Sequence, residues 1–154
     1  MHLVSRFADW LAQTSLSTAI QVNEWVIPTV QSIHIIAIGV VLGSVFMVTL
    51  RVLGLAARDQ SVADTVARFG PWMWSGLAVL LATGIIMIVG EPARELLTLS
   101  FWMKMALVVL AVLVRPRTPA PAFLMLLVWF AIVVLGRLIA YDTVWGSWSA
   151  WIRG

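Results

Sequence analysis

The chain of 154 residues contains no cysteine. This absence excludes disulfide bonds, thiolate metal sites, iron–sulfur clusters and the covalent attachment of c-type haem. The sequence also has no glycine-rich phosphate loop, no H-E-x-x-H motif and no recognisable Ser-His-Asp set. Hydrolysis and phosphoryl transfer are therefore poor candidates. The sequence leaves open whether the protein is an enzyme, and a stand-alone enzyme is not the preferred interpretation.

Charged residues are also scarce. They make up 11% of the chain, whereas 62% of the residues are hydrophobic and the mean hydropathy is +1.00. A soluble domain of this size does not have such a composition, so we expect an integral membrane protein whose main partner is the lipid bilayer. The formal charge of +3 comes from few basic residues that flank apolar segments. These residues act as topology signals, and we expect no binding of nucleic acid.

Four apolar segments are long enough to cross a bilayer, at about residues 26–50, 71–89, 96–114 and 122–140. The pattern predicts an all-α fold: an integral membrane four-helix bundle that forms a single transmembrane domain over residues 1–154. Pro28 falls in the first turn of the first span, where proline is tolerated.

The segments that flank the spans are rich in aromatic residues. Residues 5–24 mix apolar and polar side chains with the period of a helix, which predicts an N-terminal interfacial amphipathic helix. This stretch contains no uninterrupted apolar core, so we expect no cleavable signal peptide. Trp72 and Trp74 are expected where the second span enters the membrane, and the tail after Tyr141 is expected to form an interfacial aromatic belt.

The placement of basic residues predicts the orientation. The connectors after the first and third spans carry Arg51, Arg58, Arg68, Arg115 and Arg117, while the opposite side carries Arg6, Arg94 and Arg153. By the positive-inside rule, both termini lie outside the cell membrane. We therefore expect a multi-pass protein of the bacterial inner (cytoplasmic) membrane, with both termini extracytoplasmic.

Five residues that could form a site fall at one level of this bundle. With alternating span directions, His34, Met87, Lys104, Arg137 and Tyr141 all lie in the outer third of the bilayer. An ionisable side chain within a membrane span indicates a functional site by default, because burying it in hydrocarbon is costly. The sequence therefore predicts a shared outer pocket.

This set fits b-type haem. His34 would be the axial metal ligand, Lys104 and Arg137 would hold the propionates, and Met87 would be one candidate for a second ligand. The protein would then be an electron-transfer protein or the membrane subunit of a redox complex, with a redox partner protein or a quinone as its partner.

Other interpretations stay open. His34 could form a hydrogen bond between helices in a non-redox structural or anchoring subunit, or it could serve copper, quinone or proton handling. Lys104 and Arg137 could extend to the interface, and the methionines could be apolar filler. Glu91 and Glu95 are expected in an exposed loop without a nucleophile or metal cluster beside them.

The first span also contains a G-x-x-x-G motif formed by Gly39 and Gly43. Such a motif lets another helix backbone approach closely. We expect it to pack within the bundle, with a homo-oligomer formed through this face as the alternative.

Three short motifs suggest a relationship. Leu50–Gly54, Phe101–Lys104 and Gly136–Tyr141, together with the histidine-bearing first span, resemble a bacterial family of four-span membrane proteins of unknown function that is distantly similar to the CopD copper-resistance domain. The likeness extends from about residue 10 to residue 141. It implies copper handling as an alternative function, although one intramembrane histidine and scattered methionines offer few copper ligands.

Overall fold

The fold is all-α. The computed structural model describes residues 2–114 and 118–140, in which every regular element is a helix. These are α1 (His2–Ala12), α2 (Ser15–Val22), α3 (Val26–Val52), α4 (Val62–Gly90), α5 (Pro92–Leu96), α6 (Leu99–Leu113) and α7 (Pro119–Ile139). Three of them, α3, α4 and α7, are long and apolar enough to cross a membrane. This confirms the predicted all-α membrane fold.

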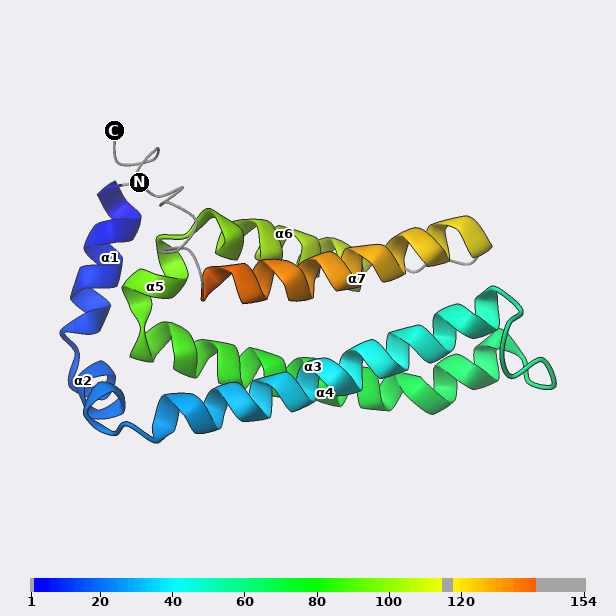
Figure 1. Ribbon diagram of the computed structural model, residues 1–154, viewed down its shortest axis with the longest axis horizontal. Helices are drawn as coiled ribbons and strands as arrows, with labels where there is room; N and C mark the ends of the chain where they lie inside the picture. The colour runs from blue at the N-terminus through cyan, green and yellow to red at the C-terminus, as the bar shows by residue number, and fades with distance from the viewer. Residues whose placement is uncertain (1, 115–117, 141–154) are drawn as a thin grey trace.

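The four longer helices form two antiparallel pairs. The α3/α4 pair lies beside the α6/α7 pair, while α1, α2 and α5 gather at one end of the bundle (Figure 1). We call this the capped end. The opposite end, where residues 53–61 connect α3 to α4, is the loop end.

Several helix boundaries differ from the expected ones. The interfacial segment is two helices, because the Thr14 side chain accepts a hydrogen bond from the Ser17 amide and starts α2. Helix α4 begins at Val62, before the expected start of the second span, because Ser61 and Asp64 form a capping box. Helix α6 has only 15 residues, so it is shorter than the roughly 20 residues that a helix needs to span a bilayer.

Helices α3 and α4 pack through a seven-residue repeat. A Cβ atom at Gly76 would lie 2.7 Å from Val41 Cγ2, and one at Gly90 would lie 2.6 Å from Ile27 Cδ1. Ile27 and Val41 are two steps of seven residues apart on α3, and Gly90 and Gly76 are the same distance apart on α4. The two contacts therefore belong to one repeat that runs along both helices. Small residues at this spacing let the two backbones approach closely.

Polar side chains of α2 form hydrogen bonds with the C-terminal end of α4. The last carbonyl groups of a helix have no partner within the helix. The Ser17 hydroxyl donates to the Val89 carbonyl oxygen at 2.7 Å, and the Gln21 side-chain amide donates to the Gly90 carbonyl oxygen at 3.0 Å. Polar residues of the N-terminal segment therefore satisfy the backbone of a membrane helix.

Helix α1 covers the capped end of the second pair. Its Ala8 is 1% exposed and forms a small core cluster with Leu96, Phe101 and Ile139. One face of the expected interfacial helix is therefore buried against α5, α6 and α7.

Candidate functional site

His34 lies in the seam between α3 and α4. It is half-buried, and its Nδ1 lies 2.6 Å from the Thr83 hydroxyl oxygen. The pair occupies the middle step of the seven-residue repeat, between the Gly76 and Gly90 contacts. Thr83 is thus the small residue that leaves room for the imidazole ring.

The partners of Thr83 favour one histidine tautomer. The Thr83 hydroxyl can donate its one hydrogen to the Val79 carbonyl oxygen, which lies at 2.7 Å. In that arrangement the Thr83 oxygen accepts from His34, so that Nδ1 carries the ring hydrogen and Nε2 keeps its lone pair. A histidine that ligates a metal is usually oriented in this manner, by a hydrogen bond from its other nitrogen.

Lys104 crosses from α6 toward α7. Its ammonium group lies 5.1 Å from the centre of the Phe101 ring, and its Cδ would lie 3.6 Å from a Cβ at Gly136. The ammonium group is also near enough to His34 and Glu95 to interact with both electrostatically. The positive charge of Lys104 therefore attracts the Glu95 carboxylate of α5 and disfavours a second positive charge on His34.

Glu95 is a site residue that the sequence analysis missed. The expected exposed loop is the short helix α5, and Glu95 at its end is only 8% exposed, so that expectation is wrong for this residue. Burial raises the pKa of the Glu95 carboxyl; the positive charges of Lys104 and Arg94 lower it, and the Glu91 carboxylate raises it. No signal within residues 91–95 could have revealed the burial, because α1 packs against α5 from a distant part of the sequence.

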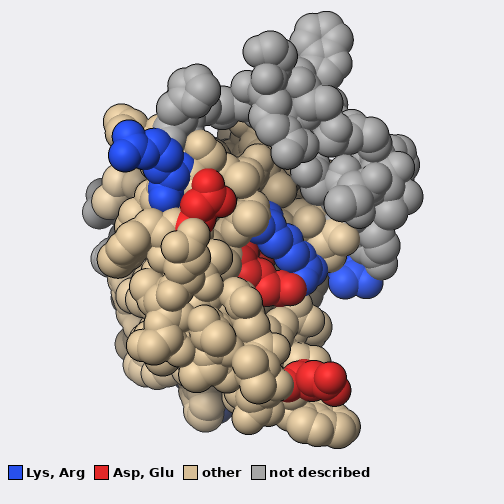
Figure 2. Space-filling model, turned by 90° about the vertical axis from the view of Figure 1, so that its left-hand side faces the viewer, with Lys and Arg blue, Asp and Glu red and all other residues tan. Residues whose placement is uncertain are grey.

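The other acidic residue of this segment stays near the surface. Glu91 accepts a hydrogen bond from Arg94 in an ion pair whose two side chains are both about one-third exposed. Acidic and basic side chains accordingly lie side by side on the capped end, amid an apolar surface (Figure 2).

The remaining predicted site residues lie at the capped end or outside the described residues. Met87 is buried in α4, one turn beyond Thr83. Arg137 is exposed near the end of α7, directly after Gly136, over which the Lys104 side chain lies. Tyr141 lies outside the described residues. The structure thus places His34 and Met87 on one helix pair, and Lys104 and Arg137 on the other.

The prediction that Gly39 and Gly43 pack within the bundle is wrong. Both glycines are exposed, and a Cβ added to either would meet nothing within 4 Å. The glycines that do mediate close helix packing are Gly76 and Gly90 of α4.

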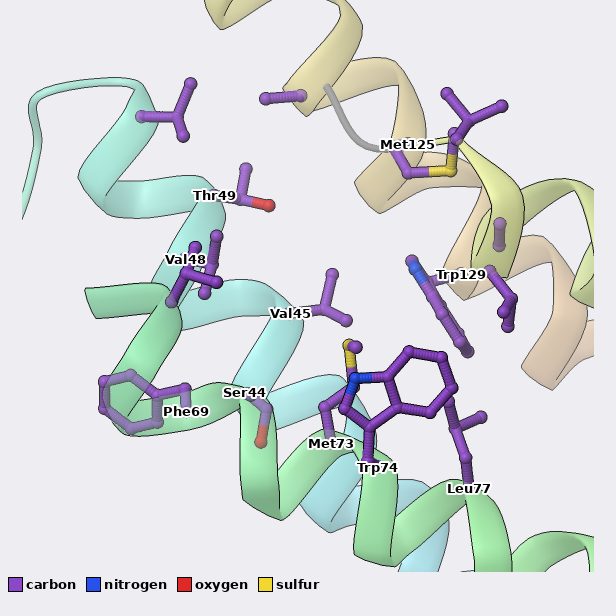
Figure 3. Close-up of a pocket in the computed structure, with 17 residues that line it drawn as sticks. Ser44, Val45, Val48, Thr49, Phe69, Met73, Trp74, Leu77, Met125 and Trp129 are labelled. Atoms are coloured by element: carbon purple, nitrogen blue, oxygen red, sulfur yellow. The ribbon is translucent and has the colours of Figure 1, made fainter. Parts of the chain in front are cut away.

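A second region with site-like features lies toward the loop end. A cavity of about 190 Å³ lies between the two helix pairs, lined by residues of α3, α4, α6 and α7 (Figure 3). Trp74, which is 47% exposed, lines it. Because α4 begins before Pro71, Trp74 lies several turns inside the helix and not in its first turn.

The described residues contain no group of three or more His, Cys, Asp or Glu side chains that could share a metal ion. A metal bound by His34 would thus need its other ligands from elsewhere, such as a macrocycle or a thioether.

Comparison with known proteins yields one relationship. The family of unknown function DUF6644 matches residues 7–119, a range that includes His34, Thr83 and Lys104 but not Arg137. No curated protein and no solved structure matches the chain. Since the matched range covers well over half of the chain, this protein belongs to the family of unknown function DUF6644.

Proposed function

We propose that the protein binds b-type haem at the capped end, with His34 Nε2 as an axial ligand, and acts in electron transfer alone or as the membrane subunit of a redox complex. The observation that carries this proposal is the hydrogen bond from His34 Nδ1 to Thr83, which leaves the Nε2 lone pair available for ligation. Haem, when bound, would supply one-electron redox chemistry.

The chemistry of the donor set supports this proposal. His34 is oriented by Thr83, and the thioether of Met87 lies one helical turn away on α4. Lys104 and Arg137 are the cations that would hold the propionates.

An optical spectrum tests the proposal directly. The protein purified in mild detergent should show a Soret band, and His34→Ala should lose it. Thr83→Val keeps the ligand but removes its orienting partner, so we expect haem affinity to fall by about 10- to 100-fold. Ser32→Ala, an exposed change two residues from His34, is the matched control and should behave as the wild type.

The contrary result is equally clear. A colourless protein that also fails to bind added haemin in reconstitution would refute haem binding. Retention of the full Soret band by His34→Ala would show that His34 is not the ligand.

The same hydrogen bond favours a second candidate, a non-redox structural or anchoring subunit. The bond between His34 and Thr83 connects α3 to α4, so the imidazole already has a structural role without any cofactor. This candidate predicts that His34→Asn, which keeps a donor at this position, retains both assembly and cellular function. Loss of function in a normally assembled His34→Asn protein would argue against it.

We further propose that the capped end faces outward from the bacterial inner membrane. Arg51, Arg58 and Arg68 all belong to the loop end or to the helix turns near it, which supports a cytoplasmic loop end by the positive-inside rule. A reporter that is active only in the periplasm, fused after residue 57, should be inactive. Activity of this fusion would reverse the proposed orientation.

A further inference from the structure

The cavity toward the loop end has apolar and aromatic walls. Phe69 and Trp74 of α4 and Trp129 of α7 provide the rings, while valine, leucine and methionine side chains fill most of the remaining lining (Figure 3). Engineered apolar cavities of about 150 Å³ stay dry and bind benzene. A cavity of about 190 Å³ therefore has room for one substituted six-membered ring.

Two polar groups in this cavity have no hydrogen-bond partner among the described residues. Thr49 and Trp129 are each only 5% exposed, yet neither the Thr49 hydroxyl nor the Trp129 indole N–H makes a hydrogen bond. Ser44, also in the lining, shows how a buried hydroxyl in a helix is usually satisfied. Its hydroxyl donates a hydrogen bond to the Val40 carbonyl oxygen at 2.8 Å. A buried indole N–H normally finds a partner.

These two groups open onto the cavity. Within the described part of the chain, no side-chain nitrogen or oxygen is both fully enclosed and without a partner. Thr49 Oγ1 and Trp129 Nε1 must therefore contact open space, and both are turned toward the space beside Val45 and Met125 (Figure 3).

The donor chemistry specifies what could occupy the space. An indole N–H can only donate, whereas the Thr49 hydroxyl can both donate and accept. A single water molecule that accepted from Trp129 and donated to Thr49 would leave its second hydrogen facing apolar groups and most of the cavity of about 190 Å³ unfilled. An apolar molecule with carbonyl oxygens would satisfy both donors without adding new ones.

From this combination we infer that the cavity binds the ring of a membrane quinone. The quinone ring is flat, suits aromatic walls and carries only acceptor oxygens, while its isoprenoid tail can extend into the surrounding lipid. A phospholipid ester also offers a carbonyl oxygen but no flat ring. The inference does not depend on haem binding, because the cavity lining includes neither His34 nor Lys104.

Equilibrium dialysis of the purified full chain with ubiquinone carrying one isoprenoid unit tests the inference. We expect saturable binding of one quinone per chain. Thr49→Val keeps the size of the side chain and removes one donor, so it should weaken binding by about three- to tenfold. Trp129→Phe removes the other donor together with part of the aromatic wall and should weaken binding at least as much. Val45→Phe should fill the space and abolish saturable binding, which also gives the baseline for quinone dissolved in detergent.

Matched controls use the same exchanges away from the cavity. Thr29→Val and Trp25→Phe alter exposed residues of the capped end and should bind quinone as the wild type does. His34→Ala should also leave quinone binding unchanged, so a failure of the haem proposal and a failure of this one are distinguishable.

Two results would overturn the inference. The first is equal quinone binding by the wild type, Thr49→Val and Trp129→Phe. The second is a phospholipid that native mass spectrometry finds bound to the protein and that excess quinone does not displace.

Discussion

At the capped end, polar side chains meet partners from other helices. Toward the loop end the two helix pairs line a partly open apolar cavity, in which Thr49 and Trp129 have no hydrogen-bond partner among the described residues. The capped end has the His34–Thr83 bond, the Ser17 and Gln21 contacts to α4, and Glu95 near Lys104. Polar groups within a membrane protein are costly unless they are paired. The difference suggests that the capped end fixes the bundle, while the cavity is left for a ligand.

The largest expected effect comes from forcing the α3/α4 seam apart. Gly76→Leu places a side chain where even a Cβ would lie 2.7 Å from Val41 Cγ2 and 3.4 Å from the Ala37 carbonyl oxygen. We expect a loss of about 1–3 kcal/mol in the free energy of unfolding, measured by thermal or denaturant unfolding in detergent. Gly43→Leu, the matched control, meets no neighbour and should leave this value nearly unchanged. Equal destabilisation by both changes would contradict the close packing of α3 against α4 at Gly76.

A smaller effect is expected from removing one polar contact at the capped end. Thr83→Val eliminates the acceptor for His34 Nδ1 while keeping the size of the side chain. Hydrogen bonds between membrane helices contribute about 0.6 kcal/mol on average and at most about 1.7 kcal/mol, so the same unfolding assay should show a loss within this range. Thr29→Val, at an exposed position of α3, should show none.

The smallest effect is a change in the pH dependence of stability. Burial raises the pKa of Glu95 above its ordinary value of 4.5, so between these two pKa values the folded state binds more protons than the unfolded state. Stability therefore falls as the pH rises from 4.5 through the folded-state pKa, and it is regained on acidification.

Glu95→Gln should remove this part of the pH dependence, as seen in unfolding curves measured at a series of pH values. Glu24→Gln, which changes an exposed carboxylate of the connector between α2 and α3, is the control and should retain it. An unchanged pH profile for Glu95→Gln would contradict the burial of this carboxyl group.

The sequence was sufficient to predict the helical membrane fold, because hydropathy and helix length depend on local composition. It also contained the signal for the early start of α4, since Ser61 and Asp64 have the spacing of a capping box.

The environment of Glu95 could not be predicted in the same manner. Its burial depends on α1 packing against α5, a contact between distant segments that leaves no periodic pattern in either one. The cavity depends similarly on how the two helix pairs meet. The roles proposed for His34, Met87, Lys104, Arg137 and Tyr141 stay predictions until a cofactor is sought.

The hydrogen bond from Ser17 to the Val89 carbonyl oxygen joins residues 72 positions apart. During synthesis, α2 therefore leaves the ribosome well before the α4 carbonyl groups to which it donates hydrogen bonds. The end of α4 is therefore completed by a helix that was synthesised earlier. Removing α2 should leave the last carbonyl groups of α4 without these hydrogen bonds and let the final turn of α4 fray.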